Sequence, residues 1–349
     1  GTVIVTLTCE FEKGAIDLNV GVENKQVVRL NYFPNLKLAY KAPAYVKADA
    51  FREVEVTLNP GEWELPGTLT LPKGDGPFPA VVLVHGSGPQ DRDEAIGPNQ
   101  PFRDLAGGLA SKGIAVLRYE KRTKHYAYKL TKRNIAITIK EEVIDDALAA
   151  VALLRTRKEI DAKQIYVLGH SLGGYLAPRI AEGDNKLAGL ILLAGNSRPL
   201  TDLIVEQADY LMALPDTTNA HKAYLEDLKK QVERIKDPKL GEGMLKSERI
   251  LDAPVAYWLS LRAYDAPATA AKLKVPMLVL QGERDYQVSM KDFEGWKKAL
   301  KGRDNVRFKS YPKLNHLFVE GEGKSQPREY GEPGHISGAV LDDIVAWIK

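Results

Sequence analysis

The chain has 349 residues, 44% hydrophobic and 27% charged, so it can bury the core of one large domain with an appendage. Acidic and basic residues are mixed along the chain with a net charge of +3, and no apolar stretch nears the roughly 20 residues of a membrane helix, so neither nucleic acid nor a membrane is expected as partner. Cys9 is the single cysteine, which excludes an internal disulfide and a cysteine-built metal site, and no metal is expected.

The amino-terminal segment alternates apolar and polar residues over about 33 positions, in the runs 3–11, 16–22 and 28–32. This period of two predicts a three-stranded antiparallel meander with turns at Gly14 and at 23–25. Three strands alone are marginally stable, so we expect them to belong to a small domain that begins upstream or to lean on the next part of the chain. Residues 1–50 are therefore predicted to form a β-rich segment and its linker, which begins at Pro34.

A hairpin around 59–62 and then alternating strands and helices predict a mostly parallel sheet in a catalytic domain spanning 51–349. The insertion 196–274 interrupts this alternation, and its helical patterns predict a cap folded over the carboxyl ends of the strands. We expect strands at 79–84, 113–119, 164–168, 187–194, 275–281 and 306–311, and helices at 102–112, 139–156, directly after Ser171, at 293–300 and ending at Trp347.

The strongest functional signal is Gly169-His170-Ser171-Leu172-Gly173, which follows an apolar strand and precedes a helix. In this context the G-x-S-x-G pattern predicts a nucleophile elbow, a sharp turn that exposes the serine hydroxyl. The glycines are needed because side chains there would collide with neighbouring backbone. A plain glycine-rich turn is the alternative.

A serine hydroxyl needs a base and an acid that orients the base, and in hydrolases with this turn they come after the serine in the order acid, then His. Of the later histidines, His316 lies in a loop after the last predicted strand, whereas His221 falls in the cap and His335 is expected at the surface where the last helix starts. His316 is the predicted base. Asp285, at the end of the strand 275–281, is the predicted acid, with a helix or turn cap beside Ser289 as the alternative. Glu283 is expected to pair with an arginine or to cap the turn.

The oxyanion of an acyl-transfer reaction needs two backbone donors aimed at one point. We expect them to be the N–H groups of Leu172 and Ser87, with Gly88 as the second choice and as a substrate contact. His85 is interpreted as structural. The charged run 89–94 is expected to be a solvated loop with internal ion pairs, with a substrate clamp as the alternative, and 119–122 to brace it. Three aromatic residues of the insertion, Tyr257, Trp258 and Tyr264, are candidates for lining the substrate pocket or for forming the core of the cap.

The segments 85–94, 169–174 and 314–318 resemble those of bacterial α/β-hydrolase carboxylesterases. The resemblance covers about 51–349. It implies the α/β-hydrolase fold, a Ser171–Asp285–His316 triad and activity on short acyl esters. Members carry a small β-rich domain of nuclear-transport-factor or cystatin-like shape before the hydrolase domain, and 1–34 is similar to the tail of one.

The sequence therefore favours a cofactor-free serine carboxylesterase that acts on small esters through an acyl-enzyme on Ser171. An acyl-peptide or oligopeptide hydrolase with the same triad is the alternative, and a non-catalytic binding protein on a hydrolase scaffold is a third interpretation. Dehalogenase and epoxide hydrolase chemistry is disfavoured because those enzymes use a carboxylate where this chain has a serine. Acyl-chain length, natural substrate, compartment and oligomeric state, a homo-oligomer included, stay open.

Overall fold

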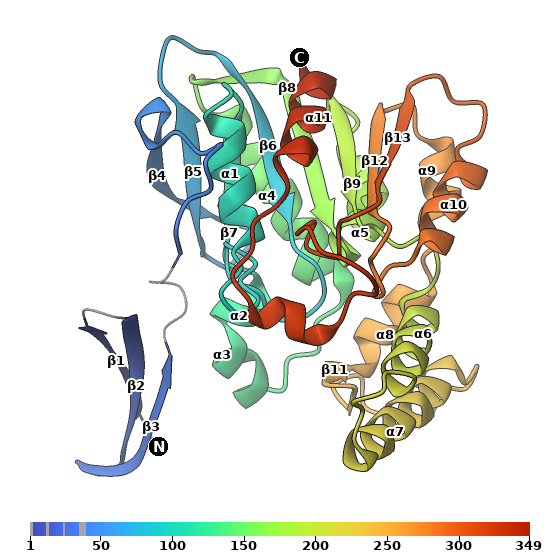
Figure 1. Cartoon of the computed structure of the whole chain (residues 1–349). Coiled ribbons are helices and arrows are strands. Elements are labelled where there is room, and N and C mark those ends of the chain that lie inside the picture. The colour runs from blue at the N-terminus through green and yellow to red at the C-terminus, as the bar shows by residue number, and fades with distance from the viewer. Residues whose placement is uncertain (1–2, 12–13, 24, 35–39) are drawn as a thin grey trace.

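The computed structural model describes residues 3–11, 14–23, 25–34 and 40–349, and its centre is an eight-stranded sheet (Figure 1). The strand order is β13-β12-β9-β8-β6-β7-β5-β4. The pairs β4/β5 and β5/β7 are antiparallel and the other neighbours are parallel. The strands are β4 (Phe51–Leu58), β5 (Leu65–Pro72), β6 (Phe78–Val84), β7 (Ala115–Tyr119), β8 (Ile160–His170), β9 (Gly189–Leu193), β12 (Met277–Gly282) and β13 (Val306–Tyr311).

Helices cover both faces of the sheet because its central strands are apolar on both sides. In β6, Val82 and Val84 enter the core formed with α4, α5 and α10, whereas Val81 and Leu83 enter the core formed with α1 and α11. The predicted mostly parallel sheet with helices is confirmed. These helices are α1 (Pro101–Ala110), α4 (Asp145–Arg155), α5 (Leu172–Gly183), α10 (Met290–Ala299) and α11 (Gly338–Ile348).

The amino-terminal strands β1 (Val3–Phe11), β2 (Gly14–Glu23) and β3 (Gln26–Pro34) form the predicted antiparallel meander as a separate sheet. Position 24 of the second predicted turn lies outside the described residues. The later part of the segment expected to be a linker is attached to the catalytic domain. Tyr40 donates a hydrogen bond to Asp104 of α1 at 2.7 Å, and Tyr45 donates one to the carbonyl oxygen of Ile336 at 2.7 Å.

The insertion 196–274 carries most of the remaining helices, and α6, α7 and α8 group at one end of the sheet (Figure 1). The segment α9 packs instead against α5 and α10, so the chain rejoins the layer beside the sheet before Lys274. No helix in the described ranges has both the length and the apolar run needed to cross a bilayer. The elements of the insertion are α6 (Leu200–Met212), α7 (Asn219–Lys236), β10 (Arg249–Ile250), β11 (Ala253–Pro254), α8 (Val255–Arg262) and α9 (Ala266–Lys272).

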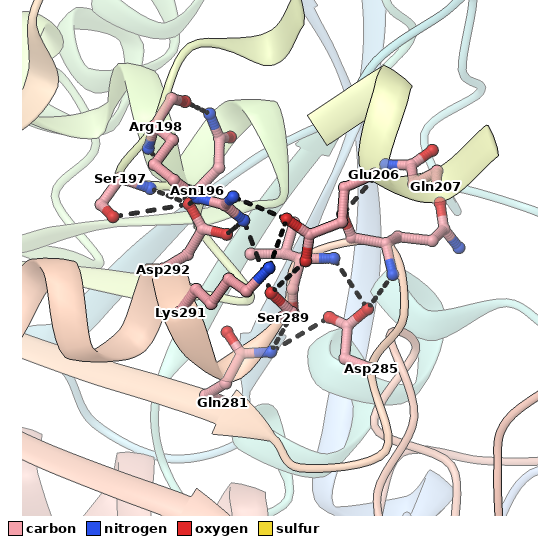
Figure 2. A network of polar contacts seen from close by, with 12 residues as sticks. Asn196, Ser197, Arg198, Glu206, Gln207, Gln281, Asp285, Ser289, Lys291 and Asp292 are labelled. Carbon is pink, nitrogen blue, oxygen red and sulfur yellow. Dashed lines mark hydrogen bonds and ion pairs between the residues drawn. The ribbon is translucent and has the colours of Figure 1, made fainter. Parts of the chain in front are cut away.

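A network of charged side chains attaches the start of the insertion to α10 (Figure 2). Arg198 forms an ion pair at 2.6 Å with Asp292, which is fully buried, and another at 2.6 Å with Glu206 of α6. Glu206 in turn accepts a hydrogen bond at 2.8 Å from Ser289, the residue before α10. The first helix of the insertion, α6, is thus fixed to α10, the helix that follows the loop of the predicted catalytic acid Asp285.

Candidate active site

Ser171 occupies the turn between β8 and α5 with φ 52° and ψ −118°, a left-handed conformation that side chains rarely adopt. Its N–H donates to the carbonyl oxygen of Leu193 in the adjacent strand at 2.9 Å, and its carbonyl oxygen accepts from Tyr175 N–H at 3.1 Å. These two bonds stabilise a strained backbone that holds the serine at the end of the sheet, as a nucleophile elbow requires.

The glycines of the motif are required by close backbone approach. A Cβ on Gly169 would lie 2.1 Å from the carbonyl oxygen of Gly173, and a Cβ on Gly173 would lie 2.2 Å from that of Val84. Both distances are too short for any side chain, so the turn and the packing of α5 on β6 depend on glycine.

The predicted acid and base form a hydrogen-bonded pair. His316 Nδ1 lies 2.7 Å from Asp285 Oδ2, and both side chains are buried. The other oxygen of Asp285 accepts the backbone N–H groups of Gln287 at 2.7 Å and Val288 at 2.9 Å, and Gln281 donates to Oδ2 at 3.1 Å (Figure 2). With Nδ1 facing the carboxylate, Nε2 is the ring nitrogen left to accept a proton.

Ser171 and His316 line one cavity of about 780 Å³, a volume typical of small-molecule sites. Ser87 and Gly88 line it from the loop after β6, and residues of α6 and α8 line it from the insertion. The structure thus brings the predicted nucleophile and base to the same cavity. Among the described residues no hydrogen bond joins the Ser171 hydroxyl to His316, as is common where a catalytic bond tightens only on substrate binding.

The buried side chain of Lys121 binds the backbone of the predicted oxyanion loop. Its ammonium donates to the carbonyl oxygens of Gly86 at 2.8 Å and of Gly88 at 2.9 Å. The N–H of Ser87 belongs to the same peptide unit as the Gly86 carbonyl and points the opposite way, away from Lys121. Leu172 begins α5, and an N–H in the first turn of a helix has no partner within the helix. Both geometries support the predicted donors, which remain predictions.

The charged run 89–94 forms ion pairs with residues outside itself, where the sequence led us to expect pairs within the run. Arg92 pairs with Glu120 at 2.9 Å, and Asp93 pairs with Arg118 of β7. Lys121 lies 3.5 Å from the buried carboxylate of Glu142. Residues that come after β7 therefore brace the loop that carries the predicted oxyanion donor.

Four further residues considered in the sequence analysis are not part of the predicted triad. His85 Nε2 is 3.0 Å from the carbonyl oxygen of Asp91, and burial lowers the pKa of His85 to about 4, which keeps the ring neutral. Glu283 accepts from Ser310 at 2.8 Å; of the two roles expected for it, the pair with an arginine is not seen among the described residues. His335, which was expected at the surface, is 35% exposed and lies 3.1 Å from Asp104. His221 is exposed at the start of α7 and is among the residues that line the large cavity.

The three predicted aromatic residues separate into two groups. Tyr257 and Trp258 line the large cavity, whereas Tyr264 lines a second cavity of about 240 Å³. Leu200 and Trp258 line both cavities and so lie between them. In the described ranges, no group of three or more His, Cys, Asp or Glu side chains is arranged to hold a metal ion.

Sequence reasoning missed two buried residues of the cavity wall, Glu94 and His170. Glu94 lies in the charged run and His170 in the G-x-S-x-G motif, both of which the sequence analysis considered. Because 75 residues separate them along the chain, their contact could not be predicted from the sequence. The only available signal was a histidine between a glycine and the nucleophile.

The fold and the site together define the class of protein. A mostly parallel sheet, a serine on a strained strand-to-helix turn and an Asp–His pair from later loops are the arrangement of an α/β-hydrolase. Residues 77–324 match the family described as serine aminopeptidase, S33, and the chain belongs to this family of hydrolases.

Comparison with known proteins supports this assignment. The chain is 43% identical over 346 residues to esterase EstD of Thermotoga maritima, which covers 99% of this chain and 79% of that protein. The predicted resemblance to bacterial α/β-hydrolase esterases is confirmed. Two solved structures share the fold. Est1E from Butyrivibrio proteoclasticus has a TM-score of 0.55 and 16% identity, and the match covers 84% of this chain and 98% of that one. An acylaminoacyl peptidase from Pyrococcus horikoshii has a TM-score of 0.52 and 17% identity, and the match covers 87% of this chain and 44% of that one.

Proposed function

We propose that the chain is a serine carboxylesterase that hydrolyses small, short-chain carboxylic esters through an acyl-enzyme on Ser171. The observation that carries the proposal is the buried His316–Asp285 bond at 2.7 Å, which leaves Nε2 of the imidazole available in the cavity that Ser171 lines. The 43% identity with an esterase supports the choice of substrate class.

In the proposed reaction His316 Nε2 takes the proton from Ser171 Oγ as the oxygen attacks the ester carbonyl. The N–H groups of Leu172 and Ser87 bind the oxyanion of the tetrahedral intermediate. The imidazolium then gives its proton to the departing alcohol, leaving Ser171 acylated. Water, deprotonated by the same imidazole, attacks the acyl-enzyme and releases the acid. Asp285 holds the ring in the required tautomer throughout.

The test is Ser171→Ala assayed on a chromogenic butyrate ester. We expect turnover to fall to the background of the assay with unchanged thermal unfolding, because the alanine removes the nucleophile and leaves the elbow. Labelling by a fluorophosphonate probe is expected for the parent chain and not for the variant. Retained hydrolysis by Ser171→Ala would refute the assignment, and a folded parent chain that resists labelling would favour a non-catalytic binding protein.

Hydrolysis of acylated or free peptides is the second candidate function. The family is described as serine aminopeptidase, and the Pyrococcus horikoshii neighbour is named an acylaminoacyl peptidase. Rates on a butyrate ester, an acylated aminoacyl anilide and a free aminoacyl anilide, measured side by side, separate the two functions. An esterase is expected to prefer the ester by orders of magnitude, whereas faster anilide cleavage would favour the peptidase.

A further inference from the structure

Two buried ionisable side chains in the cavity wall have no part in the proposed steps. Glu94, in the loop after β6, is 1% exposed, and His170, the residue before Ser171, is 4% exposed. Glu94 Oε2 and His170 Nδ1 form an ion pair at 2.9 Å. Burying a carboxylate costs free energy unless a cation and hydrogen-bond donors compensate it. A buried pair at this position therefore points to a role in the site rather than to a gain in stability.

The contacts of His170 define its charge. Its Nε2 lies 3.0 Å from the carbonyl oxygen of His316, which can only accept a hydrogen bond, and its Nδ1 faces a carboxylate. These contacts fit an imidazolium with a proton on each ring nitrogen, held beside Glu94 by charge rather than by an aligned hydrogen bond. The direction of both pKa shifts agrees with this charge. Burial alone would lower the pKa of His170, but the nearby Glu94 carboxylate leaves it raised. Burial alone would raise the pKa of Glu94, but the nearby His170 leaves it lowered.

Glu94 connects this cation to the predicted oxyanion loop. Its second oxygen, Oε1, accepts the N–H of Gly86 at 2.6 Å. The Gly86 backbone lies against the nucleophile, since a Cβ placed there would be 3.2 Å from Ser171 Cβ. A shift of Glu94 would therefore move the peptide that precedes Ser87, the predicted oxyanion donor.

His170 connects the same pair to the loop of the general base. Besides the contact with the His316 carbonyl, the two imidazole rings lie 4.7 Å apart between centroids. Asp285 orients the ring of His316, and His170 holds its backbone. The two contacts together restrict where the base can lie relative to Ser171, which is covalently bonded to His170.

We infer that Glu94 and His170 are positioning residues, which hold the oxyanion loop and the loop of the general base in register with the nucleophile. This inference rests on the proposed function. Misplacing a catalytic donor by about 1 Å costs on the order of 100-fold in rate, so a link between both loops and the elbow has a direct effect on turnover. Because the link acts on the geometry of the reacting groups, we expect its loss to lower kcat more than it raises KM.

Two conservative variants test whether geometry or charge is what matters. Glu94→Gln keeps the length of the side chain, an oxygen for Gly86 N–H and an amide donor for His170, which becomes neutral and still donates from Nε2 to His316. Glu94→Asp keeps the charge but is one methylene shorter, so it cannot reach Gly86 and His170 together. The matched control is Asp93→Asn, which alters the neighbouring residue of the same loop and its pair with Arg118.

With ester turnover as readout, Glu94→Asp is expected to lower kcat at least tenfold with KM within about twofold, because a displaced oxyanion donor weakens the transition state alone. Glu94→Gln and Asp93→Asn are expected to stay within about threefold of the parent kcat. Undiminished kcat in Glu94→Asp, or a loss in Glu94→Gln as large as in Glu94→Asp, would overturn the inference. Such a result beside an inactive Ser171→Ala leaves the proposed function intact.

A second measurement is made on the parent chain itself. In the parent chain at neutral pH, the nitrogen and proton resonances of His170 are expected to report protons on both ring nitrogens. Assignment uses His170→Gln, in which these resonances disappear. A neutral His170 with one protonated nitrogen would contradict the pairing with a Glu94 carboxylate on which the inference depends.

Discussion

The carboxylate of Asp285 has both oxygens occupied by donors that fix its orientation. One oxygen accepts the backbone N–H groups of Gln287 and Val288, and the other accepts His316 Nδ1 and the amide of Gln281. Such a carboxylate has no freedom to turn toward the substrate. In the proposed mechanism its contribution is to select the tautomer of His316 that presents an unprotonated Nε2 to the cavity.

Asp285→Asn is expected to lower kcat by about 10⁴-fold, because an amide NH₂ facing Nδ1 stabilises the opposite tautomer of His316, with the proton on Nε2. Steady-state ester hydrolysis measures the loss, and the fluorophosphonate probe should label the variant far more slowly than the parent chain. The control is Glu283→Gln in the same turn, which faces Ser310 rather than the base and should retain parent activity. An unchanged kcat in Asp285→Asn would remove Asp285 from the mechanism.

At the scale of residues, the sequence predicted the candidate site where chain order restricts the choice. Ser171 stands in a motif with its own backbone requirement, and Asp285 and His316 come after it in the only order the turn allows. Glu94 and His170 could not be paired in this way, because a buried ion pair has no spacing rule along the chain. Their contact depends on the adjacency of β6 and β8, which only the folded sheet supplies.

The insertion is connected to the rest of the molecule at the level of elements, through α6 and α10. Arg198 is the centre of this connection, because it pairs with both Asp292 and Glu206, and their side-chain contacts raise its pKa. Asp292 also accepts the backbone N–H groups of Ser197 at 2.9 Å and Arg198 at 3.1 Å. The buried carboxylate thus fixes the entry to α6.

Arg198→Ala is expected to destabilise the fold by about 1 to 3 kcal/mol, since it leaves the buried Asp292 without its cation while the two backbone donors remain. The effect is below that of a fully buried pair because the arginine is partly exposed. Urea unfolding measures it. Lys297→Ala, which removes an exposed ion pair with Glu294 on α10, is the matched control and should change stability by less than about 0.5 kcal/mol. Equal effects would mean that Asp292 is compensated by its backbone donors alone.

Two cavities meet at the start of α6, where Leu200 and Trp258 line both. Leu200→Ala should open a passage from the active-site cavity to the second cavity of about 240 Å³. The preference for longer over shorter chains should then rise, by up to about 0.8 kcal/mol for each further methylene buried. The measurement is kcat/KM for two series of esters: acetate to decanoate esters of one alcohol, and acetates of alcohols of increasing length. Comparing the two series shows whether the acyl chain or the alcohol chain of the ester enters the second cavity.

The matched control is Ile204→Ala, one helical turn later, which lines the large cavity and not the second one. It enlarges the site by a similar volume without reaching the partition. The prediction fails if both variants shift the chain-length profile alike, or if Leu200→Ala leaves it unchanged in both ester series.

Among elements, the hydrophobic period predicted the strands well and the connections poorly. The strand 306–311 was predicted to the residue, because the apolar Val306 and Phe308 alternate with the exposed Arg307 and Lys309, which is the period of two expected of a strand at the edge of a sheet. The predicted helix 139–156 instead begins with a π-helical turn, Lys140–Ile144, ahead of α4, and this local geometry leaves no trace in periodicity. The anchoring of Tyr40 and Tyr45 could not be predicted, since their partners Asp104 and Ile336 are distant in sequence.

In the whole molecule, buried polar groups concentrate where the strands of the sheet end. The turn that carries Ser171 comes after β8, the predicted oxyanion loop after β6, and the predicted acid and base after β12 and β13. Lys121, Glu94 and His170 occupy the space between these loops and are almost inaccessible to solvent. Buried ionisable groups make the stability of the folded state depend on pH, because their protonation differs from that in the unfolded chain.

His85 allows this dependence to be tested at a single residue. Burial between Phe102 and Tyr119 lowers the pKa of its imidazole from 6.5 to about 4, so the unfolded chain binds a proton there before the folded chain does. Stability from this group is therefore fully present above pH 6.5 and declines as the pH falls toward 4. The shift corresponds to about 3 kcal/mol.

His85→Phe removes this titration while keeping an aromatic ring of similar size. It should be less stable than the parent chain at pH 8 by about 1 kcal/mol, because the hydrogen bond to the Asp91 carbonyl is lost. Between pH 7.5 and 4.5 its unfolding free energy should fall by about 2 to 3 kcal/mol less than that of the parent chain, as measured by urea unfolding. Other groups titrate in this window, among them Asp146, whose pKa burial raises to about 7, but they are common to both chains and cancel in the difference. His221→Gln, at an exposed position, should match the parent profile. Parallel profiles for His85→Phe and the parent chain would show that His85 can be protonated in the folded state at little cost.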